Sequence, residues 1–404
     1  MNRFTSLFLL APIIVLSLFE PVPAQYTSTD STLVQDAIYS RPFIGSFGQT
    51  SIGGYIEGNT NSFVTSGDPE GFSFEMRRFN IFIASKISNR ITLMSELEFE
   101  HGVEEIALET ALIDFEVNTA LNFRGGILLT PIGSYNVNHD SPQWEFVDRP
   151  LVTTEIIPST LSEMGVGIFG KFFPGDLTLT YDLYLTNGLS ESGPEAGMVL
   201  NKEGRIRIAS GKAEDQFSTS GNGRPSVAAR LAVGNYNLGE IGFSYYGGIY
   251  NEYMEEGDII DNKRRLDLVA VDYNAKLPIA EITGELVYAN IDLDDDLKGR
   301  FGGEQWGGYM DIVMPVWNLP VFSYDGVLNA NLRLEYVDFN MGNFSTTGGT
   351  IYDDTKAIVP GLSFRPTEGT VFRLNYIRRW HRNYVGNDIE GQTGGIQFGF
   401  ATYF

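Results

Sequence analysis

The 404-residue chain contains no cysteine, which excludes disulfide bonds and the lipid-modified cysteine of a lipoprotein. It has only three histidines, and none of them stands at the spacing of a zinc site or of a metalloprotease helix. After residue 24, no apolar run reaches the ~18 residues that a transmembrane helix needs. We therefore expect a chain that is either soluble or crosses a membrane as β-strands.

Basic residues are also scarce, with 28 Lys and Arg against 51 Asp and Glu and a formal net charge of −23. This acidity argues against a nucleic acid as a partner. Neither a Gly-x-Ser-x-Gly elbow nor a Gly-Lys-Ser phosphate loop occurs. We predict no enzyme, no metal site and no cofactor. An outer-membrane hydrolase whose site is assembled from distant strands is a remote alternative, with His139, Asp140 and Ser141 as the nearest local trio.

What the chain does have is a repeated alternation of apolar and polar residues with the period of a β-strand. In 90–101, for example, apolar residues alternate with Glu96, Glu98 and Glu100. We predict about 16 strands from such segments and from turn signals. Their approximate spans are 51–58, 72–87, 90–101, 104–117, 120–130, 162–172, 175–186, 224–235, 239–250, 263–276, 280–291, 304–314, 327–338, 354–365, 370–380 and 393–404.

Tight turns and long segments alternate between these strands, as they do in outer-membrane barrels. The long segments are 59–71, 131–161, 187–223, 251–262, 292–303, 339–353 and 381–392. Two connections fit the scheme less well, because 315–326 is long for a turn and 101–104 is short for an outer loop. The fold class predicted is all-β, a transmembrane antiparallel β-barrel with an apolar face toward lipid and a charged face toward water.

Three regions follow from this interpretation. Residues 1–24 are expected to be a cleaved signal peptide, because one basic residue precedes an apolar stretch and small residues precede the expected cleavage site after about Ala24. Residues 25–50 show no strong period and are interpreted as a periplasmic or plug-like segment. The barrel is assigned to 51–404.

The last predicted strand places Phe400 and Phe404 on one face. This pattern resembles the C-terminal recognition strand that the barrel-assembly machinery reads. We therefore expect the protein in the outer membrane of a Gram-negative-type bacterium, in contact with its lipid and lipopolysaccharide. An alternating strand also ends many soluble sandwiches, so the ending alone does not decide the fold.

Several motifs in order resemble the phosphate-selective porin O and P family. Phe74–Ile81 resembles its early "RRA" strand, and Arg124–Gly133 resembles its strand running into Pro-x-Gly. Phe146–Pro150 and Gly165–Gly170 resemble its constriction loop and the returning strand. The resemblance implies a homotrimeric porin whose long third loop folds into the lumen. Phosphate selectivity does not carry over, because the family's anion ladder cannot be mapped onto this sequence residue by residue.

The 131–161 segment is the first candidate site, because its ~31 residues exceed what a connector needs. Folded inward, its charges would set ion preference at a constriction; left outside, they would be solvated loop charges. The candidates are His139, Asp140, Glu145, Asp148, Arg149 and Glu155.

The second candidate site consists of charged residues at the alternate strand positions that are predicted to face the lumen. They could impose a transverse field on permeating solutes, or they could fill the lumen with ion pairs. These residues are Glu96, Glu98, Glu100, Arg124, Asp182, Arg230, Arg333, Glu335, Arg373 and Arg379.

The predicted function is passive diffusion of small hydrophilic solutes or ions through a water-filled pore. The alternatives are a substrate-specific uptake channel of the anion or phosphate type and a surface-binding barrel that uses its long loops. Acidic clusters in 252–261 and 292–296 lack the spacing of an EF-hand, so we interpret them as solvated loops.

Overall fold

The computed structural model describes the following residues: 33–43, 45–47, 49–190, 205–211, 217–218, 220, 222–321, 324–384 and 392–404. The predicted signal peptide lies outside this described part of the chain. None of the helices in the described part is both long and apolar enough to cross a membrane.

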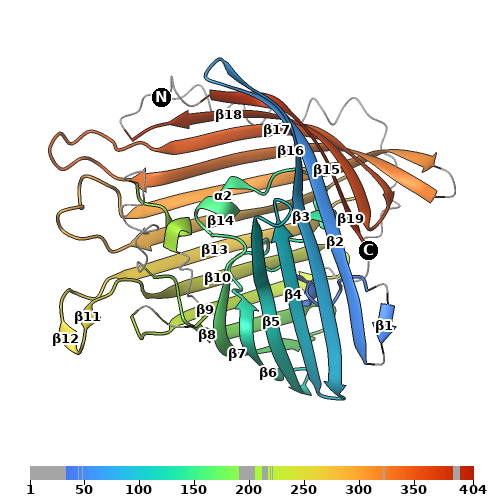
Figure 1. Ribbon diagram of the computed structural model, residues 1–404, viewed down its shortest axis with the longest axis horizontal. Coiled ribbons are helices and arrows are strands. Elements are labelled where there is room, and N and C mark those ends of the chain that lie inside the picture. Colours follow the sequence, from blue (N-terminus) through green and yellow to red (C-terminus); the bar gives the residue numbers. More distant parts are fainter. Residues whose placement is uncertain are drawn as a thin grey trace.

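Sixteen antiparallel strands close into a barrel (Figure 1). The strands are β2 (Thr50–Thr65), β3 (Asp68–Ser88), β4 (Ile91–Glu100), β5 (Glu105–Asn118), β6 (Leu121–Leu129), β7 (Ser162–Phe172), β8 (Thr178–Thr186), β9 (Ser226–Asn235), β10 (Gly239–Ile249), β13 (Arg265–Lys276), β14 (Glu281–Ile291), β15 (Glu304–Val321), β16 (Tyr324–Met341), β17 (Asp354–Thr367), β18 (Thr370–Arg382) and β19 (Gln392–Tyr403). Each pairs with its neighbour in sequence, and β19 pairs with β2 to close the ring.

Shorter elements accompany the barrel. Strand β1 (Gly45–Phe47) adds to β2, while β11 (Met254–Glu255) and β12 (Asp258–Ile259) form a separate hairpin. The helical pieces are η1 (Val34–Asp36), η2 (Ser141–Gln143), α2 (Leu151–Glu155) and η3 (Ile208–Gly211). Within the described residues, the regular secondary structure is therefore β-strand apart from a few single turns of helix.

The outward and inward faces of the strands are inverted relative to a soluble protein. In β9, Leu231 is 63% exposed on the outside while the adjacent Arg230 is 2% exposed on the inside. In β8, Leu183 and Leu185 are exposed while Asp182 is buried. An apolar exterior around a polar interior is the arrangement that suits a barrel surrounded by lipid, because lipid cannot solvate charged groups.

The predicted strands all exist, but two connections were interpreted wrongly. The expected outer loop 59–71 belongs instead to β2 and β3, which meet at a turn around Ser66 and Gly67. The expected turn 315–326 is mostly strand as well, because β15 runs to Val321 and β16 starts at Tyr324. Register shifts interrupt both pairs, and a β-bulge breaks the two-residue alternation from which the spans were read.

The interior of the barrel is packed rather than open from wall to wall. Val152 and Ile156 of the 131–161 segment belong to one buried apolar cluster with Tyr246 and Val287 of the wall. Ile206, from the segment before η3, joins the same cluster. Figure 1 shows α2 inside the ring of strands. Part of the lumen face is therefore apolar, contrary to the expectation that this face is charged throughout.

Candidate constriction inside the barrel

The 131–161 segment leaves β6 and immediately contacts the far wall. The Gly133 N–H donates to Ser244 of β10 at 3.2 Å, and the Tyr135 N–H donates to Glu285 of β14 at 2.5 Å. Gly133 has a φ of +68°, and a Cβ there would lie 2.6 Å from the Glu285 carboxylate. Glycine is needed at this turn for both reasons.

The middle of the segment is held by strands near the C-terminus. Arg365 of β17 donates to Glu145 at 2.5 Å, and Arg373 of β18 donates to the Phe146 carbonyl at 2.7 Å. Bonds on both sides of the barrel show that this third loop crosses the lumen, which confirms the prediction that it folds inward.

Arg333 of β16 ties the loop to a third part of the wall. Its guanidinium makes two bonds to Asp311, each 2.7 Å, and a third to the Asp148 carbonyl at 2.6 Å. The same group lies 4.3 Å from the centre of the Phe146 ring. Next to it, Glu335 accepts a bond from the Leu151 N–H at 2.9 Å. Through its pair with Asp311 and its bond to the Asp148 carbonyl, Arg333 stabilises the loop in its position.

The other wall candidates are also engaged in contacts. Arg124 pairs with Asp114 at 2.7 Å, and Arg230 contacts Asp272 at 2.6 Å and Glu240 at 2.7 Å. Glu98 and Glu100 pair with Arg78, at 3.1 and 2.6 Å. Arg379 is half-buried on β18. A transverse field from these residues stays a prediction.

Two β-bulges place additional charges inside the barrel. At the β2–β3 bulge, Arg77 is the extra residue, so that both Arg77 and Arg78 turn inward. At the β4–β5 bulge, Glu109 is the extra residue and lies buried beside Thr110. Strict alternation assigns neighbouring residues to opposite faces, so sequence reasoning missed Arg77, Arg78 and Glu109 as site residues. The adjacent arginines were the one available signal, because two charges in succession within a lipid-facing strand require a bulge.

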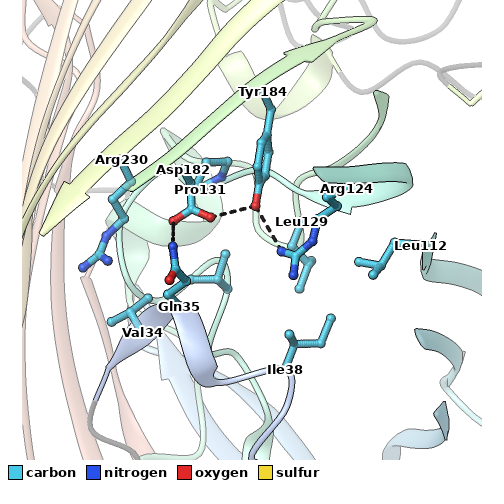
Figure 2. A pocket seen from close by; sticks show the side chains of 11 residues that line it. Val34, Gln35, Ile38, Leu112, Arg124, Leu129, Pro131, Asp182, Tyr184 and Arg230 are labelled. Atoms are coloured by element: carbon cyan, nitrogen blue, oxygen red, sulfur yellow. Dashed lines mark hydrogen bonds between the residues drawn. The ribbon is translucent and has the colours of Figure 1, made fainter. Parts of the chain in front are cut away.

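The segment 33–43 lies against the inner wall of the barrel. Gln35 donates to Asp182 at 3.0 Å, and Asp182 also accepts a bond from Tyr184, which in turn accepts one from Arg124 (Figure 2). Tyr39 bonds to Asp114. A cavity of about 30 Å³ remains between this segment and the wall. The segment therefore occupies lumen volume that solutes would otherwise cross.

Arg41 joins this segment to both the wall and the loop. Its Nη2 atom lies 2.7 Å from Glu96 of β4 and 2.7 Å from Asp140 of the loop. The guanidinium also stacks on Phe82 at 4.1 Å. Burial lowers the pKa of Arg41, but Asp140 and Glu96 outweigh burial and raise the pKa above its usual value. Arg41 is therefore charged in its buried position.

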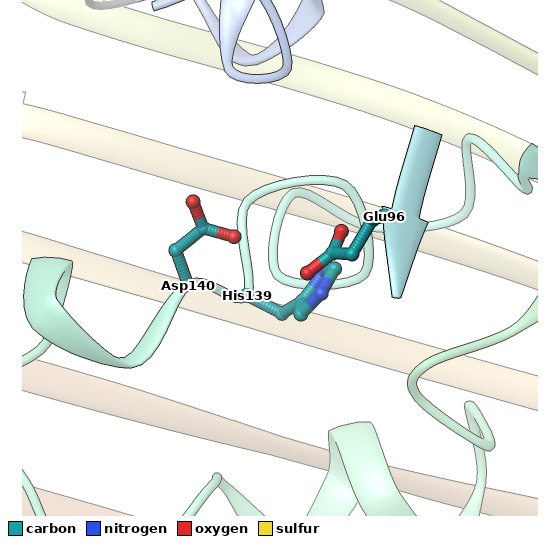
Figure 3. A group of neighbouring side chains, drawn as sticks. All are labelled: Glu96, His139 and Asp140. Atoms are coloured by element: carbon teal, nitrogen blue, oxygen red, sulfur yellow. The ribbon is translucent and has the colours of Figure 1, made fainter. Parts of the chain in front are cut away.

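Glu96, His139 and Asp140 gather around this contact (Figure 3). Their ligand atoms lie within 4.8 Å of one another, close enough to hold a metal ion. The position between the two carboxylates is filled by Arg41, however, so the cluster is an ion-pair network. Both ring nitrogens of His139 face partners other than Ser141, namely Asn136 and Glu109, so the local trio does not form a catalytic relay.

Asp148 is a loop carboxylate that stays partly exposed inside the barrel. Its side chain is 32% exposed, while it pairs with Arg77 at 3.0 Å and accepts a bond from Gln397 at 2.9 Å. Asp140 and Glu145 are buried, and Arg149 and Glu155 are half-buried. Among the predicted loop residues, Asp148 is thus an acidic group that a permeating ion can meet.

Solved structures with this architecture include outer-membrane porins. Salmonella typhi OmpF, in complex with daunomycin, aligns with 89% of this chain and 100% of its own, at a TM-score of 0.55 and 10% identity. The anion-selective porin from Comamonas acidovorans aligns with 88% of this chain and 99% of its own, at a TM-score of 0.52 and 10% identity. OmpT of Vibrio cholerae in a trimer form aligns with 88% of this chain and 99% of its own, at a TM-score of 0.50 and 10% identity. At these identities the likeness shows the fold alone.

Sequence comparison adds little to this. An uncharacterized protein of Aquifex aeolicus (strain VF5) is 32% identical over 213 residues, which are 50% of this chain and 45% of that protein. The match thus spans less than half the length of that relative. No family model matches the chain. The barrel of a porin is shown, while membership in the phosphate-selective porin O and P family stays a prediction.

Proposed function

We propose that the protein is an outer-membrane porin through which small hydrophilic solutes or ions diffuse past a constriction formed by 131–161. The observation that carries this proposal is the inverted barrel, apolar outside and polar inside, with a charged loop crossing its lumen. A pore needs this polar interior, because an ion that enters it must exchange water for other polar groups.

A substrate-specific channel is the second candidate, and the filled lumen favours it. The loop, the 33–43 segment and the residues before η3 all contact the inner wall. Such packing leaves a narrow path, in which charged groups discriminate between solutes more strongly than in a wide pore. Its selectivity for anions, phosphate or other solutes rests on the family resemblance alone.

The remaining assignments belong to the same proposal. We infer an outer-membrane location, contact with outer-membrane lipid and lipopolysaccharide, and a homotrimer, the last supported by the trimer form of a similar structure. We assign residues 25–50 a plug-like role, supported by the wall contacts of 33–43. We also infer recognition of the C-terminal strand by the barrel-assembly machinery.

Deleting Phe404 is expected to reduce membrane assembly more than the stability of protein already folded. Phe404 donates to Gly54 at 2.9 Å, accepts from it at 3.1 Å and stacks on Phe79. These contacts contribute about 1–3 kcal/mol, which is a modest part of a barrel's stability. Loss of a recognition signal, in contrast, would impair the assembly of every newly made chain. The amount of folded protein in the membrane and its urea unfolding midpoint separate the two effects. Equal membrane yields would argue against a recognition role.

Asp148→Asn is expected to shift the ion selectivity of the pore toward anions. A charge at a narrow site acts on ions within a Debye length of ~8 Å, where screening is incomplete. Asp258→Asn, in the exposed β11–β12 hairpin, is the matched control and should change selectivity less. Reversal potentials across a salt gradient measure both. A larger shift in the control than in Asp148→Asn would place the constriction elsewhere.

Neutral variants of Asp140 and Glu145 are a poorer test of selectivity. Asp148 is partly exposed, whereas both of these groups are buried in their ion pairs, with Arg41 and Arg365 respectively. Removing either leaves a buried arginine uncompensated and loosens the loop, so that selectivity and structure change together.

A further inference from the structure

We propose that Glu109 is a positioning residue for the 131–161 loop, and that it holds His139 through one shared proton. The effect on conduction rests on the proposed function, whereas the role of Glu109 in holding the loop does not. It starts from the two contacts of the His139 ring, which is 1% exposed. One nitrogen faces the loop itself and the other faces the wall.

The geometry fixes how many protons this site holds. His139 Nδ1 lies 3.0 Å from the Asn136 carbonyl oxygen, which can only accept, so Nδ1 carries a hydrogen. His139 Nε2 lies 3.1 Å from Glu109 Oε2. A bare ring nitrogen against a bare carboxylate oxygen would be repulsive. A second proton therefore lies between Nε2 and Oε2, either as imidazolium and carboxylate or as imidazole and carboxylic acid.

Glu109 reaches the ring because of the β4–β5 bulge, which leaves the residue unpaired in the ladder and turns it inward. Glu98 of β4 is a close neighbour of Glu109. The charged and titratable groups around this contact are Arg41 before β1, Tyr55 in β2, Arg78 in β3, Glu96 and Glu98 in β4, Asp140 and Arg149 in the loop and Tyr403 in β19. Acidic and basic groups are both present, so the surroundings of the contact do not favour only one sign of charge.

Losing the shared proton has a defined structural result. Two lone pairs then face each other in a buried site, and the hydrogen bond between loop and wall is replaced by repulsion. While the proton is shared, the contact holds residues 136–141 against β5. When alkali removes the proton, this part of the loop should detach from the wall. The same change would alter the size and charge of the constriction.

Glu109→Gln separates positioning from protonation. The glutamine amide can donate an N–H to Nε2 of a neutral imidazole, so the contact no longer needs the shared proton. The variant should hold the loop at all pH values tested. His139→Ala removes the contact at every pH, and His101→Gln removes an exposed histidine elsewhere as a control.

The test is hydrogen–deuterium exchange of residues 136–141 in the purified full chain, from about pH 6 to about pH 10. At each pH the exchange rate of the parent is divided by that of Glu109→Gln, which cancels intrinsic exchange. We expect a ratio near one at the acidic end, rising roughly tenfold or more at the alkaline end. His139→Ala should exchange faster than Glu109→Gln throughout, and His101→Gln should follow the parent.

A parent-to-Glu109→Gln ratio that stays constant with pH would overturn the proposal. So would the same rise with pH when His139→Ala is divided by Glu109→Gln, because His139→Ala has no shared proton to lose. Absence of the rise when His101→Gln is divided by Glu109→Gln would also overturn it. Because exchange reports the loop and not conduction, it is independent of the pore assignment. The expected exchange pattern in a chain that passes no current would support the role of Glu109 and refute the proposed function. A single-channel current that changes with pH in the parent and not in Glu109→Gln would support both.

Discussion

A chain lacking residues 33–43 is expected to form pores with roughly two- to fivefold higher conductance than the parent. The segment lies inside the barrel, where Gln35, Tyr39 and Arg41 bond to the wall and to the loop. Removing it enlarges the water-filled cross-section and frees the carboxylates of Glu96 and Asp140. Single-channel recording in a planar bilayer measures the change.

A deletion of 254–259 is the matched control, because it removes the exposed β11–β12 hairpin, whose four residues are exposed to solvent. The control should keep the conductance of the parent. If both deletions leave the conductance unchanged, the 33–43 segment does not obstruct the path. A rise in the control alone would place the obstruction at the outer rim.

Arg333→Met is expected to lower the free energy of unfolding by about 3–5 kcal/mol. The reason is that Asp311, fully buried, loses its bidentate partner and the Asp148 carbonyl loses its donor. Breaking one half of a buried ion pair costs more than removing both halves, because the remaining charge stays in a site that water does not reach. Urea unfolding in detergent or lipid vesicles measures the loss.

The double variant Arg333→Met with Asp311→Leu should recover most of that stability, since no unpaired charge is left. Arg265→Gln, whose side chain is 52% exposed, is a control expected to have little effect. Equal losses in Arg333→Met and in the double variant would show that the ion pair with Asp311 is not the main contribution of Arg333.

The alternation of apolar and polar residues, together with the alternation of tight turns and long segments, was enough to predict the barrel. Strands such as 175–186 show a strict two-residue period because one face meets an apolar medium and the other does not. The inward course of 131–161 was also predicted, but from a resemblance. Its anchors, such as Arg365 and Asn375, are single polar residues on strands far away in sequence, and no local pattern links them to the loop.

What sequence reasoning missed has physical causes that can be named. Arg77 and Glu109 sit at bulges, where one extra residue reverses the parity on which the face assignment depends. Arg41 lies in a segment without periodicity, and only its three-dimensional contacts show its position. The apolar layer around Tyr246 and Val287 faces inward because loop residues cover it, a packing relation that a single strand does not encode.

A barrel with this packed lumen should still conduct ions. The most direct measurement is a planar-bilayer recording of the purified full chain, without any substitution or deletion. We expect discrete current steps whose reversal potential across a salt gradient is set by charges of the 131–161 loop. Folded protein that inserts into the bilayer and yet leaves the current at the level of lipid alone, with or without residues 33–43, would contradict it.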